Sequence, residues 1–184
     1  PGLLEPGASF FYFLLASSPE GGFFLTEALR GAVDGPIASN QINRDAETLT
    51  RFIKGLAHYH GAVDVGVCKL QPYHIYSHIG RGTGQYGAPV TLDHPFAIAL
   101  AVEMDNALIN PRLPAVMESA RQYADSAKIA VILAAAIRAL GYPARAHIDG
   151  NYRVIAPLVA KDAGLGEIGR MGLLMTPRLG PRVR

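Results

Sequence analysis

Cysteine is almost absent from this sequence, in which Cys68 is the single thiol among 184 residues. One cysteine cannot form a disulfide within the chain, and it cannot supply the several thiolates that a zinc or iron–sulfur site needs. The residues beside Cys68 carry no signal of an activated thiolate. We therefore expect an inert core thiol at the end of a strand rather than a nucleophile.

An excess of charge of either sign is also absent, because 17 Lys and Arg stand against 15 Asp and Glu, a net charge of +2. No basic run or stripe is interleaved with aromatic residues, so we expect no nucleic-acid partner. The longest apolar run in a helical pattern, residues 129–137, is much shorter than the roughly 20 residues of a membrane span. We expect a buried helix there, no membrane partner and a cytoplasmic protein.

Hydrophobic residues make up 49% of the sequence, which is enough for one domain with a core. Residues 1–44 are rich in Gly, Pro and Ser and predict an irregular N-terminal segment, with one helix near residues 25–33. Residues 45–184 form the predicted core. The chain begins without Met and ends in a run that is not tail-like, so we expect a piece of a longer protein.

The order of elements in the core indicates the fold class. An acidic start and helical spacing of apolar residues predict a helix over residues 45–61. Period-two alternation predicts a strand over 62–68, and a continuous apolar run predicts a strand covered on both faces over 96–102. The longest helix is expected over 115–140, closed by Gly141, before a strand over 144–148. Strand, helix and strand favour a crossover unit, so the predicted class is α/β, or α+β in layers.

Two segments, residues 82–87 and 164–169, match the pattern G-x-G-x-x-G. The pattern binds a dinucleotide only where the glycines leave a strand and open a helix, and neither segment has that context. Turns that allow a close approach of the backbone are the better interpretation. His74 and His78 would share a face if their loop were helical, but no further ligand completes a site, so we expect solvated or core histidines and no metal.

Ser119 and Tyr123 lie one turn apart on the long predicted helix. Such a pair on its own is usually a packed aromatic ring with a polar neighbour. A longer match changes this interpretation. Residues 163–177 (AGLGEIGRMGLLMTP), followed by 180–184 (GPRVR), resemble the catalytic subunits of cobalamin-dependent reductive dehalogenases of the cytoplasmic, halophenol-type branch. The resemblance spans about residues 45–184 and includes four shorter segments, at residues 76–78, 102–105, 140–142 and 149–151.

The resemblance implies a set of catalytic residues. Tyr123 matches the proposed proton donor of the family, and Ser119 lines the same pocket. Asn151 matches an active-site asparagine, and Arg184 matches a basic residue near the tyrosine, with Arg182 as the alternative. A guanidinium beside the phenol would stabilise the phenolate and so help the release of its proton.

The resemblance also implies the cofactor and the fold. The family has a nitroreductase-like domain that holds a corrinoid in its base-off form. Residues 76–87 would shape the substrate side. The residues matched to cofactor binding are Gly164, Leu165, Gly166, Glu167, Gly169 and Arg170.

Members of the family carry two cysteine-rich motifs downstream of the matching segment. We therefore expect two four-iron clusters only in a segment beyond this chain, which would be truncated before its iron–sulfur domain. The chain would bind cobalamin, and electrons would come from a donor protein or a fused reductase domain. Three alternatives stay open: an epoxyqueuosine reductase-like corrinoid enzyme, a non-catalytic corrinoid-binding module, and a flavin reductase of nitroreductase type.

Overall fold

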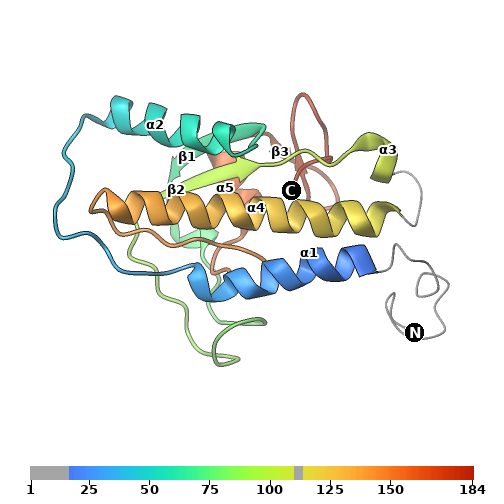
Figure 1. Cartoon of the computed structure of the whole chain (residues 1–184), viewed down its shortest axis with the longest axis horizontal. Coiled ribbons are helices and arrows are strands. Elements are labelled where there is room, and N and C mark those ends of the chain that lie inside the picture. Colours follow the sequence, from blue (N-terminus) through green and yellow to red (C-terminus); the bar gives the residue numbers. More distant parts are fainter. Residues whose placement is uncertain (1–16, 110–113) are drawn as a thin grey trace.

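The computed structural model describes residues 17–109 and 114–184. One long helix, α4 (Pro114–Ala139), runs through the middle of the molecule, and the other elements lie around it (Figure 1). The remaining elements, in chain order, are α1 (Ser17–Ala28), η2 (Leu29–Ala32), α2 (Ala46–Tyr59), β1 (Asp64–Lys69), η3 (Pro72–His74), β2 (Phe96–Ala101), α3 (Asn106–Ile109), α5 (Ala156–Asp162), β3 (Glu167–Ile168) and β4 (Leu174–Met175).

Helices α2 and α4 confirm the two main helix predictions. The Asp45 side chain caps α2 by accepting a hydrogen bond from the Thr48 amide, which satisfies one of the free donors at the helix start. Gly141 follows the last turn of α4 with a φ of 88°. Its amide donates to Arg138 and that of Tyr142 donates to Ile137, as in a Schellman motif. Helix α2 therefore begins, and α4 ends, where local chemistry predicts.

Strands β1 and β2 pair antiparallel, with Val65 opposite Leu100 and Val67 opposite Ile98. The sheet has a core on each face. One core joins it to α2 and α4 through residues such as Val65, Ile129 and Leu133. The other joins it to α5 and the segment after it through residues such as Ala99, Val159 and Leu165. The prediction that β2 is covered on both faces is confirmed.

The predicted strand over residues 144–148 is wrong, and with it the crossover unit. The segment makes one backbone hydrogen bond to Val33 and one isolated bridge between Ile148 and Asn151, and the sheet is antiparallel. Ala146 and Ile148 are buried against α4 and Val33, so the segment alternates like a strand. Alternation reports burial of one face, whereas a strand also needs a neighbour with which to pair. The fold is therefore a mixed arrangement of helices and antiparallel strands.

The N-terminal helix begins earlier than the helix expected near residues 25–33. Helix α1 packs along α4, and Gly22 lies at the contact, where a Cβ atom would come within 2.9 Å of the Ala120 carbonyl oxygen. A glycine that suggests a break in the sequence is here the residue that lets two helices approach. The division between residues 1–44 and 45–184 stays a prediction, although residues 17–32 are helical and belong to the packed body. Residues 1–16 lie outside the described ranges.

Candidate active site

Helix α4 presents Ser119 and Tyr123 on one face, and Arg184 reaches both. The Arg184 Nη2 donates to the Ser119 Oγ at 3.2 Å. Its Cζ atom lies 3.9 Å from the centroid of the Tyr123 ring, which is within the range of a cation–π contact. Three of the four residues predicted to be catalytic therefore meet at one place, although 61 positions separate Tyr123 from Arg184 in the sequence.

Backbone pairing brings Arg184 to this place. The last residues of the chain run antiparallel to the segment that continues β2, with Glu103 bridged to Val183. Arg184 and Val102 exchange two backbone hydrogen bonds of 2.9 and 3.0 Å. The Arg182 side chain binds Glu103 at 3.0 Å and the Met104 carbonyl at 3.1 Å. Of the two arginines considered from sequence, Arg184 is thus the one that contacts the tyrosine.

Helix α1 also contacts the half-buried Tyr123. The Phe23 ring lies 6.0 Å from the Tyr123 ring, centroid to centroid, at an interplanar angle of 52°. A tilted pair at this distance is a favourable aromatic contact. The phenol therefore lies between an aromatic ring from α1 and a guanidinium from the C-terminal segment.

The structure does not bring Asn151 to this cluster as a free amide. Its side chain is 5% exposed, accepts from Arg145 Nη2 at 2.5 Å and donates to the Arg30 carbonyl at 2.8 Å. An amide whose oxygen and nitrogen are both bonded within the protein stabilises the turn that contains it. A catalytic role for Asn151 stays a prediction, and it would require these bonds to be exchanged.

Sequence reasoning missed a second group of contacts, between Arg81 and Tyr152. The Arg81 guanidinium carbon lies 5.8 Å from the Tyr152 ring centroid, and Tyr152 lies 5.8 Å from the ring of Tyr76. The charge of Tyr152 and then that of Asp149 raise the pKa of Arg81, with a smaller contribution from Tyr123. Burial raises the pKa of Tyr76. The segment 76–87 was expected to shape the substrate side, but nothing local to it identified these partners.

The segment predicted to bind the cofactor forms a hairpin, with Glu167 opposite Met175. Gly164 ends α5 with a φ of 85°, and the amides of Gly164 and Leu165 donate to the last carbonyls of the helix. Leu165 is 2% exposed and packs in the core. A Cβ on Gly166 would overlap the Met175 carbonyl. Packing within the protein therefore accounts for the residue types at these three positions.

The outer surface of the hairpin has a different character. Glu167 and Arg170 are exposed, and a Cβ on Gly169 would lie 2.9 Å from Cγ of Met175. Met171 is 86% exposed and Leu173 is 50% exposed. The hairpin thus offers apolar side chains outward, whereas Gly166 and Gly169 allow the close approach of its own strands. Neither G-x-G-x-x-G segment opens a helix, as expected.

Comparison with known proteins relates this arrangement to a family. No family model matches the chain. A 74-residue segment is 43% identical to a tetrachloroethene reductive dehalogenase of Desulfitobacterium hafniense and 42% identical to one of Dehalobacter restrictus. Each match covers 39% of this chain and 13% of the relative. The solved structure of the catabolic reductive dehalogenase NpRdhA superposes with a TM-score of 0.79 at 25% identity, over 90% of this chain and 25% of that chain.

The chain resembles part of a reductive dehalogenase. Sequence and fold agree on this point, because the curated relatives and the solved structures carry the same family name. A further reductive dehalogenase structure, named for a mechanism of B12-dependent dehalogenation, has a TM-score of 0.78 at 26% identity, over 90% of this chain and 25% of that chain. The chain thus spans a quarter of the solved proteins and a smaller share of the curated ones.

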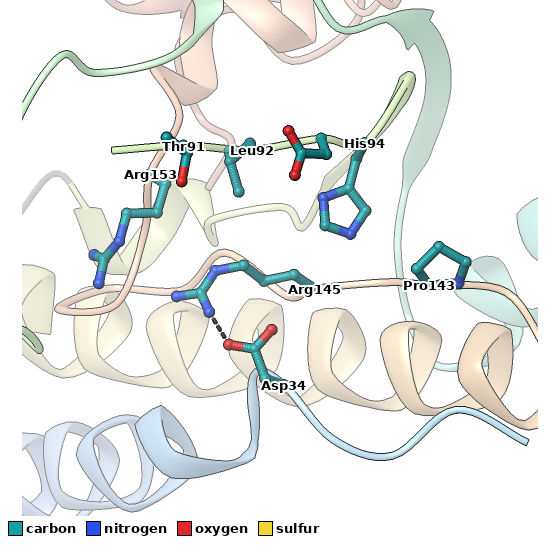
Figure 2. A pocket seen from close by; sticks show the side chains of 8 residues that line it. Asp34, Thr91, Leu92, His94, Pro143, Arg145 and Arg153 are labelled. Carbon is teal, nitrogen blue, oxygen red and sulfur yellow. Dashed lines mark hydrogen bonds and ion pairs between the residues drawn. The ribbon is translucent and has the colours of Figure 1, made fainter. Parts of the chain in front are cut away.

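In this reductive dehalogenase-like chain, a pocket of about 450 Å³ is lined by residues other than those of the Tyr123 cluster (Figure 2). Arg145, Arg153 and His94 line it, and Asp34 forms an ion pair with Arg145. Burial, then the charges of Arg145, His94 and Arg153, lowers the pKa of the adjoining His147 to about 3. Arg145 also binds Asn151, so one side of the pocket is formed by side chains that hold the 145–153 segment in place.

His74 is a core histidine, one of the two kinds expected from the sequence. It is fully buried, and its Nε2 lies 3.0 Å from the Asp162 carboxylate. Hydrogen bonds from Tyr73 and then His74 lower the pKa of Asp162, which joins η3 to α5. Burial raises the pKa of Cys68, in agreement with an inert thiol.

Within residues 17–109 and 114–184, no three His, Cys, Asp or Glu side chains are grouped so as to hold a metal ion. In the same part of the chain, no helix has the length and apolar character needed to cross a bilayer.

Proposed function

We propose that this chain is the corrinoid-binding core of a cobalamin-dependent reductive dehalogenase, which replaces a carbon-bound halogen by hydrogen. The observation that carries the proposal is the meeting of Tyr123, Ser119 and Arg184. The chain contributes these groups from α4 and from the segment paired beside β2, which are distant in sequence.

The reaction adds two electrons and one proton to the carbon–halogen bond and releases a halide ion. Side chains cannot supply the electrons, so a Co(I) corrinoid would supply them when bound. The residues of the chain hold the proton and the charges around it. Tyr123 donates its phenol proton at the carbon as the halide leaves, and Arg184, over the ring face, stabilises the negative charge left on the ring. Ser119 holds the guanidinium in place.

The residues of the hairpin fit a corrinoid in part. The exposed Met171 and Leu173 suit contact with a large, largely apolar macrocycle. Leu165 does not fit this role, because its side chain is in the core. Glu167 and Arg170 are exposed and could meet the amide groups at the rim of the macrocycle. We propose in addition that the corrinoid binds in its base-off form and that the fold is nitroreductase-like.

Electrons would reach the corrinoid through groups outside this chain. One cysteine cannot ligate a four-iron cluster, which needs about four thiolates. We infer two such clusters in a further segment of the natural protein, fed by a donor protein or a fused reductase domain, in a cytoplasmic setting. The substrate would be a small organohalide, with a halogenated phenol as the specific candidate. The complex of NpRdhA with 3-bromo-4-hydroxybenzoic acid supports this choice.

The test has two stages. Titration of the purified chain with hydroxocobalamin, followed by ultraviolet–visible spectroscopy, should give saturable binding with a base-off spectrum. In the complete natural protein, Tyr123→Phe should lower kcat by about 100-fold or more, since a positioned general acid contributes about 10²–10⁴. The matched control is Tyr59→Phe, because Tyr59 is 83% exposed on α2.

Three outcomes would contradict the proposal. A Tyr123→Phe enzyme with the rate of the Tyr59→Phe control would leave a non-catalytic corrinoid-binding module as the better description. A yellow flavin in the purified protein would favour a flavin reductase. Reduction of epoxyqueuosine in transfer RNA, without dehalogenation, would favour the other corrinoid enzyme.

A further inference from the structure

Arg81 is placed by a close contact between two loops. Gly82 has a φ of 82°, and a Cβ at this position would overlap the carbonyl of Gly150. The amide of Thr83 donates to the same carbonyl at 2.7 Å. Because the loop can lie this close only with glycine at position 82, Arg81 is held beside Asp149.

Two groups fix the Arg81 guanidinium. Its Nη2 donates to Oδ1 of Asp149 at 2.7 Å, and its Cζ lies 5.8 Å from the Tyr152 ring centroid. Tyr152 and Tyr76 form a tilted aromatic pair next to it. The result is a guanidinium of defined orientation at the edge of an aromatic surface.

The Arg81 guanidinium also has donors to spare. Asp149 is shared with Arg30, whose Nη2 lies 3.7 Å from Oδ2, so two guanidinium groups face one carboxylate. The Arg81 side chain is 65% exposed. A guanidinium has five N–H donors, and the bond to Asp149 uses one of them. The rest can reach an acceptor in solution.

Helix α1 and the η2 turn that follows it link Arg81 to the proposed proton donor. Phe23 of α1 lies against the Tyr123 ring, and Arg30, seven residues later, pairs with the Asp149 carboxylate that Arg81 also binds. The aromatic pair and the guanidinium on one side, and the phenol on the other, are therefore placed about two helical turns apart along α1 and η2. An aromatic molecule with a negative oxygen at one end would match the first two groups while its carbon–halogen bond meets the third.

We propose that Arg81 is a specificity-determining residue, which binds a negatively charged oxygen of an aromatic organohalide while Tyr152 and Tyr76 contact its ring. This inference rests on the proposed function of the site. The anionic oxygen is a carboxylate or a phenolate, which share the geometry that a guanidinium recognises.

The experiment compares three probes in the corrinoid-loaded complete protein. They are 3-bromo-4-hydroxybenzoic acid, its methyl ester, which lacks the carboxylate, and its 4-methoxy analogue, which lacks the phenolate. Arg81→Gln should raise KM for the acid by about 10- to 100-fold, as expected for loss of a charge-assisted hydrogen bond, with a smaller effect on kcat. KM for the probe that lacks the recognised oxygen should not change, which identifies the group bound.

Two variants and one binding measurement keep the test decisive. Arg81→Lys retains the charge without the planar fork and should restore part of the affinity. Arg51→Gln is the matched control, because Arg51 is paired with Glu47 on the outer face of α2. Calorimetric titration with 4-hydroxybenzoate, which carries no halogen, reports binding without turnover and should show weaker binding for Arg81→Gln.

The outcomes separate the two proposals. If the natural protein dehalogenates the probes but Arg81→Gln leaves their relative KM values and the 4-hydroxybenzoate affinity unchanged, the role of Arg81 is refuted and the dehalogenase function stands. If no probe is dehalogenated but 4-hydroxybenzoate binds and Arg81→Gln abolishes binding, the anion site stands and the proposed function fails. An equal rise of KM for all three probes would also refute charge recognition by Arg81.

Discussion

Gly66 and Gly55 offer one substitution, glycine to alanine, with opposite expected effects on stability. Gly66 lies in β1 with α5 against it, and a Cβ atom there would overlap the Ala163 carbonyl and lie 2.5 Å from Cδ1 of Leu165. Gly55 lies within α2, with no atom within 4 Å of the position that a Cβ would take. The two sites therefore differ in space rather than in chemistry.

The expected magnitudes follow from this difference. At position 66 the obstacle is backbone, which cannot rotate away, so β1 and α5 must separate, and overpacking of this kind costs about 1–3 kcal/mol. At position 55 alanine replaces a flexible residue in an exposed helix, which should stabilise the fold by about 0.5–1 kcal/mol. For a domain of this size, each kcal/mol shifts Tm by about 2–4 °C.

Urea unfolding of the purified chain, followed by circular dichroism, measures both effects. The midpoint should fall for Gly66→Ala and rise for Gly55→Ala, with the same dependence on urea. A Gly66→Ala chain as stable as the wild type would refute the packing of α5 on β1. A fall for both variants would instead indicate that glycine is required for flexibility at both sites.

Two further predictions concern charge and catalysis. Because the pKa of His147 falls from 6.5 to about 3 on folding, the unfolded chain binds more protons between these values, so stability should fall by up to about 2 kcal/mol from pH 6.5 to pH 5. His147→Asn, which keeps an acceptor for the Arg153 amide, should flatten this dependence in urea midpoints, and an unchanged slope would assign it to other groups. Ser119→Ala removes the 3.2 Å bond to Arg184 and should lower kcat of the complete enzyme by about 3- to 10-fold without changing KM. A KM effect alone would place Ser119 in substrate binding instead.

Local chemistry in the sequence was enough to predict the main helices and one chemical pair. Asp45 caps α2 through an amide three residues away, and Gly141 ends α4 through bonds within five residues. Ser119 and Tyr123 share a face because of helix geometry alone. These features depend on residues within one or two helical turns of each other, so a short stretch of sequence contains every partner that each feature needs.

Partners that are distant in sequence had to come from the tertiary structure. The alternation at residues 144–148 reported burial, but whether a strand lay beside it was decided elsewhere in the chain. Asn151 is the residue type expected of an active-site amide. Its bonds to Arg145 and to the Arg30 carbonyl show that the side chain holds neighbouring segments together. Residue type alone carries no information on which partner is within reach.

The same distinction between local and distant partners applies to the candidate site. The sequence by itself determined that α4 carries a hydroxyl and a phenol one turn apart, and a family resemblance pointed to a basic residue far downstream. Only the tertiary structure decided that Arg184, rather than Arg182, contacts Tyr123, and that Arg81 lies against Tyr152. The physical reason is the position of each arginine along the extended segment, because residues 182 and 184 are two apart and so lie on the same face. The pairing beside β2 sets Arg184 opposite Val102, whereas Arg182 lies further along, at Met104.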